Sequence, residues 1–351
     1  MPGDQLGVAL VGSGMISEFQ TRAIADVEHA HVVGFFDTVP ELAAKRAAQF
    51  GRKAFATLDA LLADPAVDIV SICTPSGAHR DPAVAAARAG KHVMVEKPVE
   101  VTPERIDEII AACRASGVTL GAIFPRRFFD STRALKQAVD AGRFGALSLA
   151  DVYIKWYRSQ EYYDSGGWRG TWKLDGGGAL MNQGIHGIDL VQWLMGGVDS
   201  VCAHTATLAH ERIEVEDTAT ASVRYRNGAL GVIEGSTAAW PGQKIRIEIS
   251  GSKGHVVMVD ETILEWRFAE ESPHDAEVRA AFGPRGGLSG GGASDPKAID
   301  TEGHRRQFDD FVGAIRAGEK PFCDGVEGRH AVAVITSIYR SAREGRAVRV
   351  E

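Results

Sequence analysis

The feature that most constrains the fold is an alternation of short apolar runs with alanine-rich stretches of helical period over residues 6–124. The apolar runs cover residues 6–11, 32–36, 69–72, 93–95 and 119–123. Helix-like stretches at 41–50, 82–89 and 103–115 separate them, and Thr102 is a natural N-cap in front of Pro103. Short apolar strands that alternate with helices predict a parallel sheet covered on both faces. The sequence therefore predicts a doubly wound α/β domain.

The pattern changes after residue 125. A helix-like stretch at 131–141 is followed by apolar runs at 147–157, 201–208, 218–225, 230–237, 244–250 and 256–260, and Asn227-Gly228 is a strong hairpin signal. One helical pattern, at 179–194, interrupts these runs. Consecutive strands without intervening helices predict a large open, mainly antiparallel sheet. We expect a first domain over residues 1–125 and a second α/β domain over 126–351, with a helical region at 303–351 that could pack back on the first.

Composition excludes several classes of protein. The 351 residues carry a net charge of −7, and no Lys/Arg run with interleaved aromatics supplies a nucleic-acid surface. No apolar run reaches the length of about 18 residues that spans a bilayer, and no signal peptide opens the chain. The cysteines are scattered, which argues against a structural metal or disulfide framework: Cys73, Cys113, Cys202 and Cys323. We expect a cytoplasmic protein with no metal, no nucleic-acid partner and no membrane partner.

A glycine-rich turn follows the first apolar run. It reads Gly12-Ser13-Gly14-Met15-Ile16 and opens a predicted helix, while Asp37 ends the second run. Glycine lets the backbone turn sharply and approach a pyrophosphate at a helix N-terminus. A carboxylate at the end of the next strand can accept both ribose hydroxyls and repels a 2′-phosphate. The context predicts dinucleotide binding, with NAD favoured over NADP because of Asp37.

Two further motifs lie at the carboxyl ends of predicted strands, where ligands bind in open parallel sheets. Cys73-Thr74-Pro75 with His79 follows the third run, and by itself it could be an ordinary strand-to-helix turn. Glu96-Lys97-Pro98 follows the fourth run. A lysine in a loop is usually a solvated charge, but at this edge of a sheet it can stabilise a developing alkoxide.

The helical pattern at 179–194 carries the strongest catalytic signal. Asn182, His186 and Asp189 are spaced i, i+4, i+7 and so share one face of an α-helix. His186 could be an acid–base catalyst, a satisfied buried histidine or, least favoured, a metal ligand. Seven Tyr and Trp residues lie in the window 153–172, among them Tyr157 and Tyr163. Such rings suit the apolar faces of sugars, and a packing surface or a subunit interface explains them equally well.

Taken together, these motifs resemble the glucose–fructose oxidoreductase/inositol dehydrogenase (Gfo/Idh/MocA) family over nearly the whole chain. The resemblance implies an N-terminal Rossmann domain and a C-terminal domain whose open sheet often forms the oligomer interface, hence a homodimer or homotetramer. It also implies that Lys97 and His186 are catalytic and that Asn182 is the third polar member of the site. Many relatives carry Asp at that position, and an Asn cannot ionise. Trp168-Arg169 and Arg127 match family positions near the cofactor or the substrate.

The resulting expectation is NAD-dependent hydride transfer between nicotinamide and a secondary alcohol or ketone of a sugar, sugar derivative or cyclic polyol. His186 takes the hydroxyl proton, Lys97 stabilises the alkoxide, and Asn182 and Asp189 orient the substrate or the imidazole. An NAD-recycling glycosidase or lyase and a catalytically idle NAD-binding sensor stay open. The expected substrate-binding residues are Lys97, Tyr157, Tyr163, Asn182 and His186. The expected cofactor-binding residues are Gly12, Ser13, Gly14, Met15, Ile16, Asp37, Cys73, Thr74, Pro75, His79, Glu96, Lys97, Arg127, Trp168 and Arg169. The sequence connects no function with the glycine-rich stretch 283–292.

Overall fold

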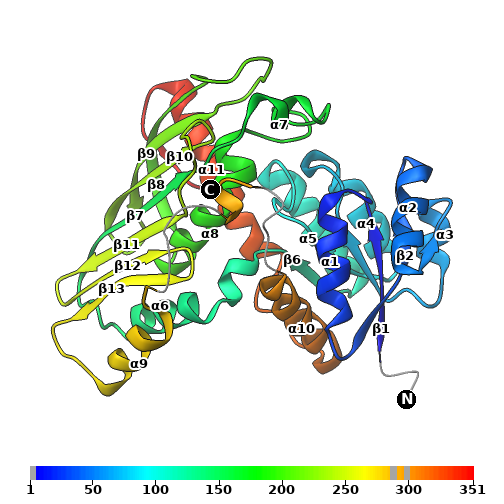
Figure 1. The fold of residues 1–351 in the computed structure, drawn as a ribbon, viewed down its shortest axis with the longest axis horizontal. Coiled ribbons are helices and arrows are strands. Elements are labelled where there is room, and N and C mark those ends of the chain that lie inside the picture. Colours follow the sequence, from blue (N-terminus) through cyan, green and yellow to red (C-terminus); the bar gives the residue numbers. More distant parts are fainter. Residues whose placement is uncertain (1–4, 285–290, 296–300) are drawn as a thin grey trace. The chain divides into compact units, whose positions relative to one another are not determined.

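The computed structural model of the chain describes residues 5–284, 291–295 and 301–351. Its backbone contacts divide the chain into two compact units (Figure 1). The first unit consists of Met1–Pro125 together with Asp300–Arg329, and the second consists of Arg126–Ile299 together with His330–Glu351. Residues 285–290, which belong to the glycine-rich stretch, lie outside the described residues.

The first unit is built on a six-stranded parallel sheet in the order β3-β2-β1-β4-β5-β6. Its strands are β1 (Leu6–Val11), β2 (Ala30–Phe36), β3 (Lys53–Ala54), β4 (Ile69–Ile72), β5 (His92–Val95) and β6 (Leu120–Ala122). The helices between them are α1 (Met15–Ala25), α2 (Pro40–Phe50), α3 (Leu58–Ala63), α4 (Arg80–Arg88) and α5 (Pro103–Ser116). Thr102 caps α5 through its side chain, as the sequence predicts. The doubly wound α/β domain is confirmed.

One helix from the C-terminal part of the chain completes the core of this unit. Helix α10 (Glu302–Ala317) contributes Phe308, Phe311 and Val312 to the cluster that buries strands β1 and β2. Its Gln307 accepts a hydrogen bond from the Phe124 backbone N–H at 2.9 Å. The helical region at 303–351 is therefore divided. Helix α10 packs in the first unit, whereas most of α11 (Gly325–Glu344) belongs to the second.

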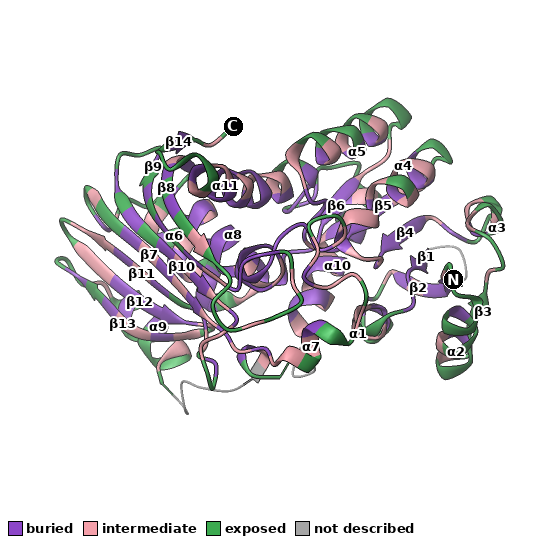
Figure 2. Cartoon of the chain, turned by 90° about the horizontal axis from the view of Figure 1, so that it is seen from above, coloured by how far each residue is buried: buried purple, intermediate pink, exposed green. Residues whose placement is uncertain are grey.

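The second unit is built on an eight-stranded sheet in the order β13-β12-β11-β7-β10-β9-β8-β14. Strands β7 and β10 pair in parallel and the other neighbours are antiparallel, which confirms a mainly antiparallel sheet. Buried and exposed residues alternate along its strands (Figure 2), so one face is covered and the other is open. The strands are β7 (Leu147–Lys155), β8 (Val198–Ala206), β9 (Thr218–Tyr225), β10 (Leu230–Ser236), β11 (Arg246–Gly251), β12 (Gly254–Val259), β13 (Thr262–Phe268) and β14 (Val348–Arg349).

Helices α6 (Asp130–Asp140), α7 (Gln160–Asp164), α8 (Ile185–Leu194) and α9 (Pro273–Phe282) complete the described part of this unit. Strand β13 is absent from the predicted runs. It follows β12 through Asp260, which adopts a left-handed conformation with φ of 48°. No glycine marks this hairpin, so the turn signals of the sequence missed it.

The single helix predicted at 179–194 is wrong in its first third. Residues Ala179–Gly184 form a π-helical segment, and α8 begins only at Ile185. An apolar pattern over one or two turns does not distinguish i→i+4 from i→i+5 hydrogen bonding. The α-helical spacing therefore holds from His186 to Asp189, whereas Asn182 lies in a wider turn. Such π-helical turns occur often at functional sites.

Candidate active site

The first predicted site element is the turn between β1 and α1. Gly12 has φ of +95°, and a Cβ at this position would lie 2.6 Å from the Cys73 carbonyl oxygen, so a side chain is excluded. Gly14 is the N-cap of α1 and has open space where a Cβ would lie. Ser13 is buried, Met15 is exposed and Ile16 lies between these extremes. A tight turn with an uncovered helix N-terminus fits the pyrophosphate of a dinucleotide.

Asp37 lies beside this turn. Its Oδ2 accepts a hydrogen bond from the Ser13 N–H at 2.7 Å, and its Oδ1 accepts one from Val39 at 2.9 Å. The carboxylate is thus oriented by the backbone on both sides. Arg46 of α2, which the sequence argument missed, donates to the Gly14 carbonyl at 2.9 Å and to Glu18 at 2.5 Å. The turn is therefore supported from α1, α2 and β2 together.

The segment after β4 lies directly against the glycine turn. The Cys73 N–H donates to the Val11 carbonyl at 2.7 Å, and burial raises the pKa of the Cys73 thiol well above its usual range. The Thr74 hydroxyl donates to the Ala78 carbonyl at 3.0 Å, and Pro75 is partly buried. His79 is 1% exposed, and its ring nitrogens face backbone carbonyls. Both ring nitrogens of His79, a predicted cofactor contact, thus lie against backbone carbonyls of the protein.

The Glu96-Lys97-Pro98 segment follows β5, and its carboxylate is buried in a polar network. Glu96 Oε1 accepts from Gln20 at 2.6 Å, and Gln20 accepts from the Ser71 hydroxyl at 2.5 Å. Glu96 Oε2 accepts from the Lys97 N–H at 3.1 Å. His304 Nε2 of α10 lies 3.8 Å from Glu96. The Lys97 backbone N–H is therefore bonded to a carboxylate that side chains of α1 and β4 orient, while the Lys97 side chain is only partly buried.

In the second unit, Glu216 holds the start of the π-helical segment. Its carboxylate accepts hydrogen bonds from the N–H groups of Gly178 and Leu180 and from the Tyr339 hydroxyl, each at 2.9 Å. A Cβ on Gly178 would lie 1.7 Å from the Glu216 carbonyl oxygen, so this close approach requires glycine. Burial raises the pKa of Glu216 to about 7. No local pattern in the sequence pointed to Glu216.

Asn182 in the π-helical segment and His186 at the start of α8 are polar side chains that are not fully buried. The Asn182 Nδ2 donates to Asp175 Oδ1 at 2.8 Å, and Asp175 Oδ2 accepts from the Gly170 N–H at 2.9 Å. This chain of bonds orients the Asn182 amide. His186 lies in the first turn of α8, one π-turn after Asn182. Both side chains are thus carried by an element that Glu216 anchors.

Asp189 and Arg127 form a buried ion pair. The Asp189 carboxylate accepts from Arg127 Nε at 2.8 Å and from Nη2 at 2.6 Å, and the two side chains are 2% and 0% exposed. This pair joins α8 to the turn at Pro125–Phe128. The sequence expectation assigned Asp189 to the substrate or the imidazole and Arg127 to the cofactor, but the structure pairs them with each other inside the second unit.

The aromatic residues at 153–172 differ in how far they are buried. Tyr163 is buried and its hydroxyl lies 2.7 Å from the Thr237 hydroxyl, so this predicted substrate contact is part of the core. Tyr157 is partly buried, and its N–H donates to the Ala293 carbonyl at 3.2 Å. The Arg169 guanidinium lies 4.7 Å from the Trp168 ring and 4.2 Å from the Tyr162 ring. The side chains of Tyr162 in α7 and of Trp168 and Arg169 after it form one partly buried cluster.

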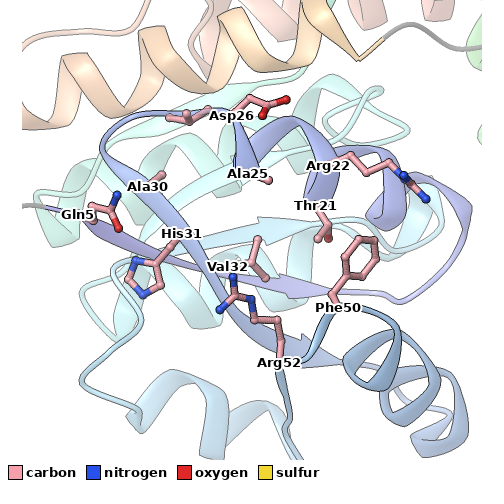
Figure 3. Close-up of a pocket in the computed structure, with 11 residues that line it drawn as sticks. Gln5, Thr21, Arg22, Ala25, Asp26, Ala30, His31, Val32, Phe50 and Arg52 are labelled. Atoms are coloured by element: carbon pink, nitrogen blue, oxygen red, sulfur yellow. The ribbon is translucent and has the colours of Figure 1, made fainter. Parts of the chain in front are cut away.

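A pocket of about 470 Å³ lies elsewhere in the first unit (Figure 3). Its lining comes mainly from the C-terminal half of α1, the connection that follows it and the first residues of β2. Gly12 and Asp37 follow the carboxyl ends of β1 and β2 and do not line it, so the pocket is separate from the cofactor turn. Within the described ranges, no three His, Cys, Asp or Glu side chains form a group that could hold a metal ion. No helix in the described part of the chain is long and apolar enough to cross a bilayer.

Both units match known protein families. Residues 6–124 match the model of the oxidoreductase family with an NAD-binding Rossmann fold, and residues 132–257 match the GFO/IDH/MocA C-terminal domain. The WlbA dehydrogenase of Bordetella pertussis, solved with NADH and UDP-GlcNAcA, is 37% identical, with 99% of each chain covered and a TM-score of 0.90. The WlbA dehydrogenase of Chromobacterium violaceum, solved with the same two ligands, is 34% identical over 100% of this chain and 97% of that chain, with a TM-score of 0.88. The inositol 2-dehydrogenase of Rhizobium meliloti is 27% identical over 97% of this chain and 98% of its own length.

Proposed function

Since the chain belongs to the Gfo/Idh/MocA family of NAD-dependent oxidoreductases, we propose that it oxidises a secondary alcohol of a nucleotide-linked sugar, with NAD⁺ as the hydride acceptor. The observation that carries the substrate class is the identity of 37% and 34%, over nearly full length, to two dehydrogenases solved with UDP-GlcNAcA. Sugars, sugar derivatives and cyclic polyols such as inositol are the wider class within which this substrate falls.

The residues that hold the cofactor in this proposal are those of the glycine turn. The N-terminus of α1 and the backbone of Gly12, Ser13 and Gly14 receive the pyrophosphate. Asp37 accepts the ribose hydroxyls, and its charge disfavours a 2′-phosphate, which makes NAD the preferred dinucleotide. When bound, the nicotinamide supplies a hydride acceptor.

Three side chains remove the proton, stabilise the charge and hold the hydroxyl. His186 removes the proton from the substrate hydroxyl as the hydride leaves the same carbon, so that the alcohol becomes a ketone. The Lys97 ammonium stabilises the negative charge that develops on the oxygen. Asn182, with its amide oriented by Asp175, holds the hydroxyl by a hydrogen bond. Asn182 does not ionise. In this proposal it therefore takes no part in proton transfer, and His186 accepts the hydroxyl proton without help from a carboxylate at position 182.

The test is turnover with purified protein. NADH absorbance is followed with UDP-GlcNAcA, UDP-GlcNAc and myo-inositol, each with NAD⁺ and with NADP⁺. We expect reduction of NAD⁺ with a UDP-sugar. His186→Ala should lower turnover by a factor on the order of 10² to 10⁴, the usual contribution of a general base, with NADH affinity unchanged. His204→Ala, at an exposed strand position of the second unit, is the matched control and should turn over normally.

Other outcomes identify the alternatives. Consumption of a sugar without net NADH would instead support an NAD-recycling lyase or glycosidase. Tight NAD binding with no turnover on any of these compounds would support a sensor. Near-normal turnover by His186→Ala would reject the assigned base.

We extend the proposal to the oligomeric state. On the open face of the second sheet, Leu149 and Leu230 are 49% and 46% exposed and lie opposite each other in neighbouring strands. Paired apolar side chains on an open sheet favour burial against a second copy, in a homodimer or homotetramer. Light scattering should give a multiple of the chain mass, and Leu230→Lys should reduce it. A monomer at micromolar concentration would contradict this part.

A further inference from the structure

His79 lies between two segments that follow neighbouring strands of the first unit. Its Nε2 lies 2.8 Å from the Thr74 carbonyl oxygen, in the segment after β4. Its Nδ1 lies 2.9 Å from the Pro98 carbonyl oxygen and 3.3 Å from that of Val99, in the segment after β5. The side chain is 1% exposed. A histidine placed in this way is a bridge between two backbone segments and presents no nitrogen to solvent.

The two segments that His79 joins belong to different parts of the proposed site. The Thr74 segment packs on the cofactor turn, since Gly12 lies so close to it that a Cβ would be 2.8 Å from the Thr74 nitrogen. The Pro98 segment continues directly from Lys97. The bridge made by His79 therefore joins the backbone that shapes the cofactor turn to the backbone that carries the lysine.

Histidine suits this bridge for a geometric reason. Its two ring nitrogens point in different directions from one rigid ring, so one side chain reaches both backbone segments. The neutral ring donates a hydrogen bond to one of them, and the protonated ring donates to both. Glutamine carries both amide hydrogens on a single nitrogen, and phenylalanine fills a similar volume without any donor. Both replacements leave at least one buried carbonyl without its present partner, which is unfavourable.

We propose that His79 is a positioning residue for Lys97, which sets the distance of the lysine from the cofactor turn and does not itself touch the cofactor. The inference rests on the proposed function in that Lys97 is there assigned to the alkoxide. A misplacement of about 1 Å in such a group can lower turnover on the order of 100-fold. The expected effect is thus on kcat, with NADH affinity retained.

The experiment measures the position of Lys97 without using activity. Wild type, His79→Gln and His79→Phe are treated briefly with acetic anhydride, and mass spectrometry gives the rate of acetylation at Lys97 relative to the other lysines. The control is His92→Gln. His92 begins β5, the strand that leads to Lys97, and its Nδ1 accepts from the Thr119 N–H at 3.0 Å at the opposite end of the sheet.

We expect the acetylation rate of Lys97 to change several-fold in His79→Phe and less in His79→Gln, and to stay at the wild-type value in His92→Gln. NADH titrations should give the same affinity for all four proteins, and the kcat of the His79 variants should fall in the same order as the acetylation rate changes. Should His79→Phe not fold, His79→Gln carries the test. An unchanged Lys97 rate in folded His79 variants, or an NADH affinity that falls with kcat, would overturn the proposal.

The proposed function fails separately. Normal turnover by Lys97→Met would remove Lys97 from the chemistry, and the acetylation result would still report whether His79 positions it.

Discussion

The substitution Asp189→Asn separates a structural role from a chemical one. In the structure both carboxylate oxygens of Asp189 accept hydrogen bonds from Arg127, at 2.8 and 2.6 Å, and neither side chain is more than 2% exposed. An asparagine keeps the shape of the side chain but removes its negative charge. The Arg127 guanidinium then stays buried with an amide in place of its counter-ion. Its contact with the Trp193 ring, at 5.2 Å, remains.

The cost follows from this geometry. A hydrogen bond to a charged group contributes about 1.5–3 kcal/mol, and two are weakened at once. Removal of one partner from a buried ion pair lowers the free energy of unfolding by about 3–5 kcal/mol, because an uncompensated charge is left behind. We expect a loss in this range for Asp189→Asn, measured by urea unfolding with circular dichroism.

The neighbouring pair Arg126–Asp260 supplies a matched control. Its atoms are also 2.8 Å apart, but the side chains are 20% and 21% exposed. Asp260→Asn makes the same chemical change at a partly exposed pair, where water screens the charges, and should cost about 1 kcal/mol. Equal losses in the two variants would refute the reasoning, since burial would then not decide the cost.

A double replacement tests the chemistry. Replacement of a buried ion pair by apolar residues of similar volume is often neutral or stabilising, so Arg127→Met with Asp189→Leu should recover most of the stability. If turnover recovers as well, Asp189 acts only by fixing α8. If turnover stays low at restored stability, Asp189 also orients the substrate or the imidazole.

Three further changes have defined outcomes. Burial raises the pKa of Glu216 from 4.5 to about 7, so its stabilising contribution is full below pH 4.5 and is lost as the pH rises through 7. Urea unfolding at pH 5 and pH 8 should therefore show a drop larger by about 2.5 kcal/mol in wild type than in Glu216→Gln. Asp37→Ser should lower the ratio of the NADP to the NAD dissociation constant by about tenfold or more, by fluorescence titration, because a like charge is removed. Arg46→Gln should weaken NADH several-fold at unchanged kcat, because Arg46 supports the carbonyl of Gly14 and contacts no reacting atom; an unchanged affinity would contradict this role.

Much of the first unit could be predicted because its signals are local. Five of the six parallel strands contain a short apolar run, whereas the exposed two-residue strand β3 was not predicted. Helix α5 shows its own period and is capped by Thr102 in front of Pro103. The glycine turn is equally local, since the sharp turn at Gly12 and the open N-terminus at Gly14 follow from the residues themselves. The same holds for the antiparallel class of the second sheet, although β13 lacked a turn signal.

The partners of the site residues could not be predicted, because they come from distant positions. Glu216 caps the segment that begins near Gly178, Arg127 binds Asp189 from 62 residues away, and Gln307 reaches back to Phe124. No spacing rule connects such pairs. The π-helical turn at Ala179–Gly184 was not predicted for a related reason. Side-chain periodicity does not show to which carbonyl each backbone N–H donates.

The sequence by itself determined the fold class and the cofactor turn, because turn chemistry and periodicity act over a few residues. The resemblance of its motifs to the family implied Lys97, Asn182 and His186 as candidate catalytic groups. Only the tertiary structure decided which predicted residues face other parts of the protein. In the structure Asp189 pairs with Arg127, His79 lies against backbone carbonyls and Tyr163 lies against Thr237, all of them buried. The physical reason is burial. A polar group taken out of water must find its partner within the fold, and the partner is chosen by the packing of segments far apart in the chain.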